Sequence, residues 1–346
     1  MKNIFLLVIL IIYIPVCAQT RLIAVELNTE NLYDTIHDSL KNDQEFLPDS
    51  PRHWNSLKYW QKINRIGKEI ISCSEYFPGR PLPDIVALCE VENDSVLFDL
   101  TRRSLLRKAR YEYVVTSSPD LRGINVALLY SPFTFQCLRV DTLRITPLKN
   151  MRPTRDILHV TGRTVDNDTL HVFVLHSPSR WGGEIVSRPY RVHVINRLCV
   201  ATDSLLVANP KANIIVMGDF NDYTDSKALQ IAYSHNLFNV SHDAKGSNGA
   251  QGTYRYKGIW HSLDHILVSP NLAHRVNNCT INDQPFLTEP DEKYGGIKPR
   301  RNYLGMRFNN GFSDHLPLVL EINLLVVSFP LSHLYRKIKD CTNVDG

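Results

Sequence analysis

The feature that most constrains the fold is a succession of short apolar segments, each of strand length and each bounded by turn or polar residues. Rich in Val, Ile and Leu, these segments are predicted to be β-strands at 21–27, 84–89, 125–130, 133–140, 157–160, 170–176, 213–218, 263–268 and 316–322. Two longer stretches, 54–77 and 192–207, have apolar residues at a spacing near 3.6 and predict helices. Because several strands follow one another between these helices, the order favours a layered α+β domain over a strictly alternating parallel sheet.

The N-terminus carries a pattern that must be separated from the fold. Lys2 precedes an apolar run from Ile4 to Val16, and a small residue, Ala18, follows. This order is typical of a secretory signal peptide, here cleaved after Ala18. A lipid anchor on Cys17 is the alternative, which the bulky residue before it disfavours. The sequence therefore predicts a secreted or periplasmic protein.

The remaining chain is interpreted as one domain. We predict a signal peptide at 1–18, a single folded domain at 19–323 and a C-terminal tail at 324–346. A net charge of +4, from 39 basic and 35 acidic residues, is too balanced to mark a nucleic-acid-binding protein by composition alone. The cysteines outside the signal peptide are widely spaced without a zinc-type pair, so we expect buried thiols rather than a disulfide framework. A monomer without an obligate protein partner is expected.

Polar residues stand at the ends of several predicted strands. They are Glu90 after 85–89, His176 after 171–175, Asp219 and Asn221 after 214–218, Asp264 and His265 before 266–268, and Asp314 and His315 before 316–320. Taken singly, each fits a turn or a helix cap. Because strands of one sheet bring their ends to a common edge, these side chains are expected to converge. The carboxylates of Glu90, Asp219 and Asp314 are hard oxygen ligands that suit Mg²⁺, Mn²⁺ or Ca²⁺.

An ordered set of motifs then resembles a known family. The motifs are LNTENL at 27–32, DIVALCEVEN at 84–93, RGINVALLY at 122–130, HSPSRWGG at 176–183, GDFND at 218–222, LDHILVS at 263–269 and SDHLPL at 313–318. Together they resemble the endonuclease/exonuclease/phosphatase superfamily, which includes DNase I, exonuclease III, neutral sphingomyelinases and inositol-polyphosphate 5-phosphatases. The resemblance implies a four-layer α/β/β/α sandwich of the DNase I type, in which two mainly antiparallel sheets pack face to face.

The resemblance also implies a metal centre. Glu90 matches the principal Mg²⁺ ligand, and Asn28 matches the amide beside it that orients the metal or the phosphate. Asp314 matches a carboxylate on the metal side of the site. Mg²⁺ is the expected cofactor, with Mn²⁺ as an alternative.

The catalytic groups implied by the resemblance lie in the other motifs. Asp219 matches the residue that positions or deprotonates the attacking water, and Asn221 matches the one that holds the phosphate. His176 and His315 match the two imidazoles, with Asp264 as the carboxylate partner of His315.

Arginines near the motifs are candidates for phosphate contacts. A guanidinium can bind a phosphate through two parallel hydrogen bonds, and Arg122, Arg180 and Arg191 are the candidates here. A solvated surface position is the competing interpretation, mainly for Arg180 and Arg191.

Three details stay open at this level. No acidic partner for His176 can be identified. The ring of His265 either competes for Asp264 or faces the other side of its strand. The aromatic residues at 253–256 and Trp260 suit membrane contact, stacking on bases or sugars, or a packed lid.

The sequence thus predicts a secreted, Mg²⁺-dependent enzyme that hydrolyses phosphodiester bonds. A DNase I-like nuclease is the first interpretation, with nucleic acid as the substrate. The alternative is a phosphodiesterase or phosphatase that acts on a phospholipid or a sugar phosphate. An inactive binding domain is disfavoured because every metal and histidine position of the motifs is retained.

Overall fold

The structure is a computed structural model that describes residues 21–75 and 82–324. The predicted signal peptide, Phe77 and residues 325–346 of the predicted tail lie outside these residues. Two six-stranded sheets form the centre of the molecule. The first has the order β13 (Val276–Ile281), β18 (Leu318–Asn323), β1 (Arg21–Leu32), β2 (Ile85–Val91), β4 (Asn125–Tyr130) and β3 (Glu112–Val115). The second has the order β5 (Phe135–Leu143), β6 (Ile157–Thr164), β7 (Thr169–His176), β8 (Asn213–Asp219), β12 (Asp264–Val268) and β9 (Phe238–Asn239).

Helices and small hairpins complete the described fold. The helices are α1 (Ser56–Ser72), α2 (Asp94–Phe98), α3 (Glu184–Ala208), α4 (Lys227–Ser234) and α5 (Pro270–Ala273), with short 3₁₀ or π turns at Gln44–Phe46, Asp99–Arg103 and Leu105–Lys108. The hairpins are β10 (Tyr254–Tyr256) with β11 (Ile259–His261), β14 (Thr288–Pro290) with β15 (Ile297–Pro299), and β16 (Tyr303–Leu304) with β17 (Arg307–Phe308). Most strand pairs are antiparallel, whereas β1 with β2 and β7 with β8 are parallel.

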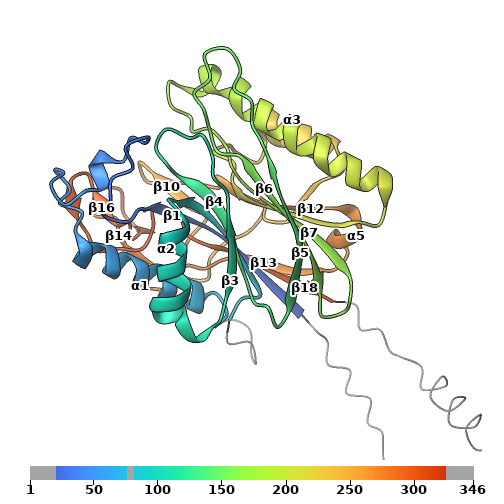
Figure 1. Ribbon diagram of the computed structural model, residues 1–346, viewed down its shortest axis with the longest axis horizontal. Helices are drawn as coiled ribbons and strands as arrows, with labels where there is room; N and C mark the ends of the chain where they lie inside the picture. The colour runs from blue at the N-terminus through green and yellow to red at the C-terminus, as the bar shows by residue number, and fades with distance from the viewer. Residues whose placement is uncertain (1–20, 76–81, 325–346) are drawn as a thin grey trace, which may run out of the picture.

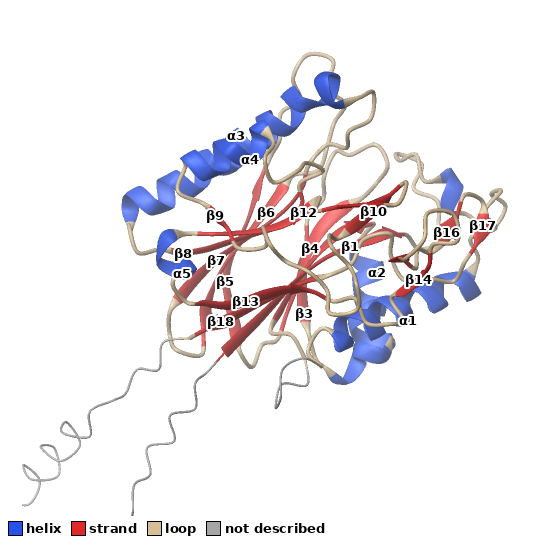
Figure 2. Ribbon diagram, turned by 180° about the vertical axis from the view of Figure 1, so that it is seen from behind, coloured by secondary structure: helices blue, strands red, loops and turns tan. Residues whose placement is uncertain are grey.

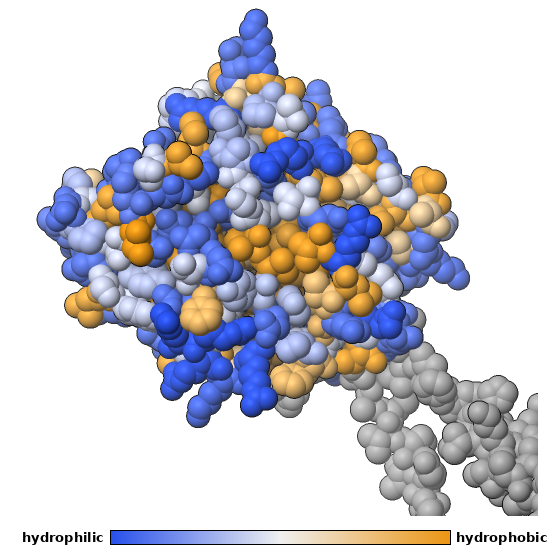
Figure 3. Space-filling model, viewed as in Figure 1, coloured by the Kyte–Doolittle hydropathy of each residue, from blue (hydrophilic) through white to orange (hydrophobic). Residues whose placement is uncertain are grey.

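The sheets pack face to face, with helices outside each (Figures 1 and 2). One apolar core lies between the sheets, a second packs α1 against the first sheet, and a third packs α3 and α4 against the second sheet. Figure 3 shows apolar side chains gathered near the middle of one face, where β4 and β5 lie in Figure 1. The predicted α+β class and four-layer sandwich are therefore confirmed.

The side-chain alternation of β1 shows why its residues form this element. Leu22 and Ala24 belong to the core between the sheets, whereas Ile23 and Val25 belong to the core under α1. Since side chains of a strand alternate between its two faces, Asn28 continues the row that faces the opposite sheet. The same alternation applies to His176, Asp219 and Asp264, which extend the inward-facing apolar rows of β7, β8 and β12 into a polar end. Glu90 does not follow this alternation, because it comes after the outward-facing row of β2.

The predicted strands are all present, and the differences concern helices and small elements. The predicted helix 54–77 is helical at Ser56–Ser72, where the side chain of Asn55 caps its first turn. Helix α3 begins at Glu184, ahead of the predicted start at Val192. The sequence did not show this start because Ile185 and Val186 are exposed, outside any buried stripe, and a proline follows at 189. The elements that the sequence did not predict are α2, α4, α5, β3, β9, β13 and the hairpins. Most of them are too short to show a period, and β13 is a largely polar strand with little buried surface.

Two further expectations concern cysteines and membranes. The thiols at 73, 89, 137, 199 and 279 are free, while Cys341 lies outside the described residues. Within residues 21–75 and 82–324, no helix has both the length and the apolar character needed to cross a bilayer.

Candidate active site

The polar strand ends meet at one end of the inter-sheet core and line a cleft of about 500 Å³. Its walls contain Asn28, Asn31, Glu90, Arg122, His176, Ser179, Arg180, Asp219, Asn221, Tyr223, Tyr254, Tyr256, His261, Leu263, Asp314 and His315. The cleft therefore brings together the sequence-predicted residues from both sheets, except Asp264, which lies directly behind His315.

A bulge places Glu90 in this cleft. The pairing of β2 with β4 shifts register between Cys89 and Val91, and Glu90 adopts a left-handed backbone with φ of 64°. A bulge of this kind turns a side chain out of the ladder. One Glu90 oxygen, Oε2, accepts a hydrogen bond from the Asn31 backbone N–H at 2.9 Å, and the Arg122 guanidinium lies 3.6 Å from it.

Close contact between β7 and β8 aligns two more candidates. Gly218 has φ of 152°, and a Cβ atom there would lie 1.9 Å from the carbonyl oxygen of Leu175. Only glycine fits this approach. The parallel register then sets His176 opposite Asp219, with His176 Nε2 at 3.5 Å from Asp219 Oδ2.

Asp219 is buried and held by amide donors. The backbone N–H of Asn221 donates to Oδ1 at 2.8 Å, and the side-chain amides of Asn28 and Asn221 donate to Oδ2 at 3.1 and 3.2 Å. Burial, followed by the nearby Asp264 carboxylate, raises the pKa of Asp219 to about 7. A carboxyl group with this pKa exchanges a proton near neutral pH.

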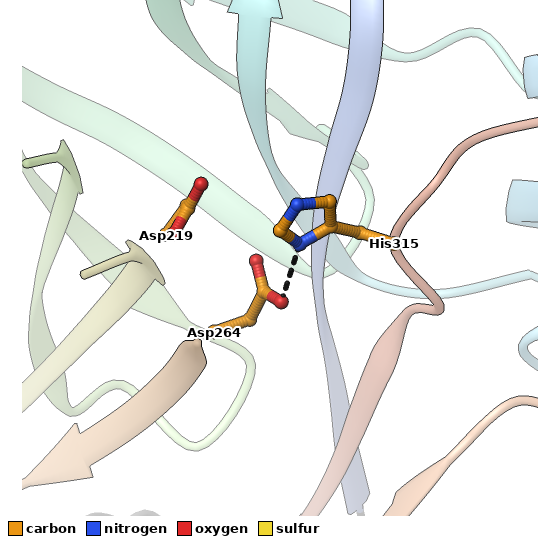
Figure 4. Close-up of side chains that lie close together, drawn as sticks. All are labelled: Asp219, Asp264 and His315. Atoms are coloured by element: carbon orange, nitrogen blue, oxygen red, sulfur yellow. Dashed lines mark hydrogen bonds and ion pairs between the residues drawn. The ribbon is translucent and has the colours of Figure 1, made fainter. Parts of the chain in front are cut away.

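Asp264 and His315 form a buried pair. Figure 4 shows the two carboxylates of Asp219 and Asp264 on neighbouring strands, with the His315 imidazole reaching them from the opposite side. His315 Nδ1 lies 2.7 Å from Asp264 Oδ2, which also accepts a hydrogen bond from the Thr253 hydroxyl. Burial lowers the pKa of His315, but the Asp264 carboxylate outweighs it and raises the pKa well above its usual value. The Asp264 carboxylate therefore favours the imidazolium form of His315 and orients its ring.

His176 has the opposite character. Burial, followed by the charges of Arg155 and Arg122, lowers the pKa of His176 well below its usual value. Nε2 faces Asp219 and, at 4.0 Å, Glu90 Oε1, while Nδ1 has no hydrogen-bond partner among the described residues. His176 therefore has no acidic partner at Nδ1 among the described residues, and the carboxylates of Asp219 and Glu90 lie on its Nε2 side.

The donor set fits a hard divalent cation. Glu90, Asn28 and Asp314 offer oxygen atoms to one cleft. Glu90 Oε1 accepts no hydrogen bond from the described residues, and its ion-pair partner, His176 Nε2, lies 4.0 Å away. Asp314 is held by Arg301, whose Nη2 donates to Oδ2 at 3.0 Å. Oxygen ligands of this kind are those that Mg²⁺ and Mn²⁺ prefer.

A second group of possible ligand atoms lies deeper. Atoms of Asp219, Asp264 and His315 come within 4.8 Å of one another. His315 Nδ1 is already engaged by Asp264, so a cation between them would have to replace that hydrogen bond. This hydrogen bond makes the group less suited to a cation than the Glu90 side of the cleft.

Two of the three candidate arginines line the cleft, and the third is buried outside it. Arg122 and Arg180 line the cleft, and the Arg180 guanidinium lies 4.1 Å from the ring centroid of Tyr223. Arg191 is fully buried, and its nitrogens bond to Asp222, Ser187 and Glu184. The expectation that Arg191 contacts phosphate is wrong, because its guanidinium joins α3 to the segment after β8.

His265 faces away from the cleft. Its Nε2 lies 3.0 Å from the backbone oxygen of Asp222, and its Nδ1 lies 3.2 Å from Asn239 Nδ2. The sequence left open whether the His265 ring competes for Asp264 or faces the other side of its strand, and the structure shows the second arrangement.

Sequence reasoning missed several residues of this site. Asn31, Tyr223 and His261 line the cleft, and Arg301 bridges Glu30 and Asp314. Asn31 stood within a motif and was detectable there. Tyr223 and Arg301 lie in loops and His261 ends the three-residue strand β11, so none of the three belongs to a periodic pattern.

Comparison with known proteins settles the family. Residues 23–324 match the model of the endonuclease/exonuclease/phosphatase family. The chain belongs to this family. Its members are hydrolases that act on phosphoester bonds, generally with a divalent metal. A comparison with curated proteins finds no match.

Solved structures share this fold at low sequence identity. An endonuclease/exonuclease/phosphatase family protein from Bacteroides thetaiotaomicron has a TM-score of 0.59 and 16% identity, over 89% of this chain and 99% of that one. The mannosyl-6-phosphatase of the same organism has a TM-score of 0.58 and 16% identity, over 88% and 100%. The catalytic domain of human Nocturnin, with bound sulfate, has a TM-score of 0.54 and 19% identity, over 88% and 95%.

Proposed function

We propose that this protein is an exported, divalent-metal-dependent hydrolase of phosphodiester bonds and acts as a nuclease of the DNase I-like type. The observation that carries the proposal is one cleft that joins an oxygen donor set, a carboxyl group with a pKa near 7, and two histidines whose pKa values are shifted in opposite directions. Groups with pKa values pushed apart in one cleft are the arrangement that acid–base chemistry needs.

Each side chain has a role that follows from its contacts. Asp219 accepts the proton of the attacking water, and the amides of Asn28 and Asn221 fix its carboxylate. A divalent cation held by Glu90, Asn28 and Asp314 would offset the negative charge that develops on the phosphate oxygens.

The histidines act on the leaving side. His315, kept cationic by Asp264, donates from Nε2 to the phosphate or to the departing oxygen. Neutral His176 holds its Nε2 beside Asp219 and Glu90, which favours the tautomer that carries the proton on Nε2. Arg122, on the same wall, adds a cationic contact to the phosphate.

A phosphatase that acts on a sugar phosphate is the second candidate. The mannosyl-6-phosphatase among the structural neighbours favours it, since that protein has the same fold. The cleft, however, carries aromatic rings beside the phosphate site, with Tyr223 and His261 stacked at 5.1 Å between centroids. Such rings suit the planar groups of a nucleic acid better than a small sugar.

Purified protein decides between these substrates. The chain would be assayed with Mg²⁺ against DNA, RNA, sphingomyelin, inositol phosphates and mannose 6-phosphate, with Glu90→Gln as the inactive control. We expect nucleic acid to be cleaved, EDTA to abolish the cleavage, and added Mg²⁺ or Mn²⁺ to restore it. Full activity in EDTA, or hydrolysis of monoesters or lipids alone, would overturn the proposal.

Export is tested separately. The mature protein recovered from the cell envelope or medium should begin at Gln19. An N-terminus at Met1, or a lipid on Cys17, would contradict the proposed cleavage.

A further inference from the structure

A second groove opens beside the catalytic cleft and shares Arg122 and Ser179 with it. It has a volume of about 550 Å³ and lies between four loops and the start of α3. The loops join β1 to α1, β3 to β4, β5 to β6, and β7 to α3. Its walls contain Asn42, Asp120, Leu121, Arg122, Asn150, Met151, Arg152, Pro153, Thr154, Arg155, Pro178, Ser179, Trp181, Val186, Ser187 and Tyr190. A substrate bound at the catalytic cleft can therefore extend into this groove.

Trp181 is the most unusual residue of the groove. Its side chain is 75% exposed, although tryptophan is normally well buried. The guanidinium of Arg152, itself exposed, lies 4.8 Å from its ring centroid. An exposed indole next to a guanidinium is a platform on which a flat ring can stack.

The groove is also cationic. Three arginines line it against the single carboxylate of Asp120. Asp120 Oδ2 already accepts a hydrogen bond from Arg155 Nη1 at 3.1 Å, and Arg122 Nη2 lies 3.6 Å from Glu90 Oε2. Among the described residues, Arg152 is therefore the groove arginine without a carboxylate partner, and it remains to attract an anion. An acyl chain gains nothing from such charge, whereas a nucleotide presents both a flat base and a phosphate.

Buried polar groups in the wall lack partners. Arg155 and Thr154 are nearly fully buried, and neither Arg155 Nε nor Thr154 Oγ1 has a hydrogen-bond partner in the described structure. Arg155 Nη2 donates to the carbonyl oxygen of Ser177 at 2.6 Å, and the same oxygen accepts from Asn221 Nδ2 at 3.1 Å. The groove wall is thus bonded directly to the backbone that positions a catalytic residue.

We propose that this groove binds an unpaired nucleotide that flanks the scissile phosphate. Its base stacks on Trp181, and its phosphate lies against Arg152. A base within a duplex has both faces covered by its neighbours and cannot stack on a side chain. The enzyme therefore prefers single-stranded over duplex nucleic acid. This inference rests on the proposed nuclease function.

Binding is tested first, without catalysis. In EDTA, a single-stranded oligothymidylate should quench the fluorescence of the native protein, and the quench should be largely lost in Trp181→Phe because the indole is gone. The other three tryptophans, at 54, 60 and 260, lie outside this groove and remain in the variant. An equal quench in both proteins would overturn the assignment of the groove.

Specificity is tested next with Mg²⁺. The assay compares kcat/KM on a single strand, on the duplex of the same sequence, and on bis(p-nitrophenyl) phosphate. In Trp181→Ala, the ratio of single-strand to small-diester activity should fall about tenfold, whereas Trp181→Phe should restore most of it. Phe133→Ala is the matched control, because this ring is 68% exposed and lies outside both the groove and the cleft.

The outcomes separate the two proposals. If native protein cleaves the duplex as well as the single strand, or if Trp181→Ala lowers all three activities equally, the groove proposal is wrong while the nuclease function stands. If native protein hydrolyses none of the nucleic acids, the proposed function itself is wrong. Loss in Trp181→Ala of activity on phospholipid vesicles would reassign the groove to lipid.

Discussion

Replacement of Asp264 by Asn tests the charge state of His315 directly. The change keeps the shape of the side chain and removes the charge that lies 2.7 Å from His315 Nδ1. At an effective dielectric constant of ~20, two unit charges at this separation attract by about 4–6 kcal/mol, part of which burial offsets. Without that attraction, burial lowers the pKa of His315 against the weaker effects of Asp219 and Asp314, so the change favours the neutral ring.

The expected consequence is a loss of catalysis with substrate binding retained. General acid–base groups contribute roughly 10²–10⁴-fold to a rate, which is the range that a contribution of ~3–5 kcal/mol supplies. Asp264→Asn should therefore lower kcat by about that factor on a small chromogenic diester, with KM little changed. The downfield proton signal of His315 Nδ1 should disappear from the NMR spectrum at the same time.

Thr253→Val provides the matched control. The Thr253 hydroxyl donates to the same oxygen of Asp264, so this change removes a hydrogen bond from an uncharged donor and leaves the ion pair intact. A hydrogen bond to a charged acceptor contributes about 1.5–3 kcal/mol to stability, but its removal leaves the charge next to His315 in place, so we expect a smaller loss of kcat than in Asp264→Asn. Both variants are compared by thermal melting to establish that they fold. A kcat of Asp264→Asn within tenfold of the native value, or an equal loss in both variants, would refute the reasoning.

Two further predictions concern single side chains. His315→Ala and His176→Ala should each lower kcat by about 10²–10⁴-fold. The ring of His265 is buried on the other face of its strand, so His265→Ala should lower the melting temperature with little effect on kcat. A near-normal kcat for His315→Ala would contradict this prediction. Gly218→Ala should destabilise the fold by at least ~2 kcal/mol, because its Cβ would meet a carbonyl oxygen of the adjacent strand. Unfolding by denaturant measures this loss of stability. An unchanged midpoint of unfolding would show that β7 and β8 move apart at little cost.

The sequence predicted the layers well because their signals are local. Strand-length apolar runs and a helical stripe are properties of neighbouring residues, and the polar strand ends at Glu90, Asp219 and His315 follow from them. The sequence does not predict the sharing of one pocket by Arg122 and Trp181, since loop conformation decides it. For Arg191 the sequence suggested a phosphate contact that the structure does not show. Its position near a motif made it a candidate, but residue spacing could not predict its buried ion pairs with Asp222 and Glu184.

The catalytic contacts join the two sheets, and this leads to a last prediction. Asn28 on the first sheet bonds to Asp219 on the second, and Asp264 on the second bonds to His315 beside the first. The core between the sheets therefore sets the distances of the site, whereas the core under α3 does not.

Adjacent isoleucines of β8 separate these two effects. Both Ile215 and Ile214 are fully buried, but Ile215 lies in the core between the sheets and Ile214 in the core under α3. Ile215→Ala and Ile214→Ala should each cost about 2–5 kcal/mol of stability. Only Ile215→Ala should also lower kcat at a temperature where both variants are folded, because displacement of reacting groups by about 1 Å can cost ~10²-fold. Measured kcat values that fall equally in the two variants would show that inter-sheet packing does not set the geometry of the site.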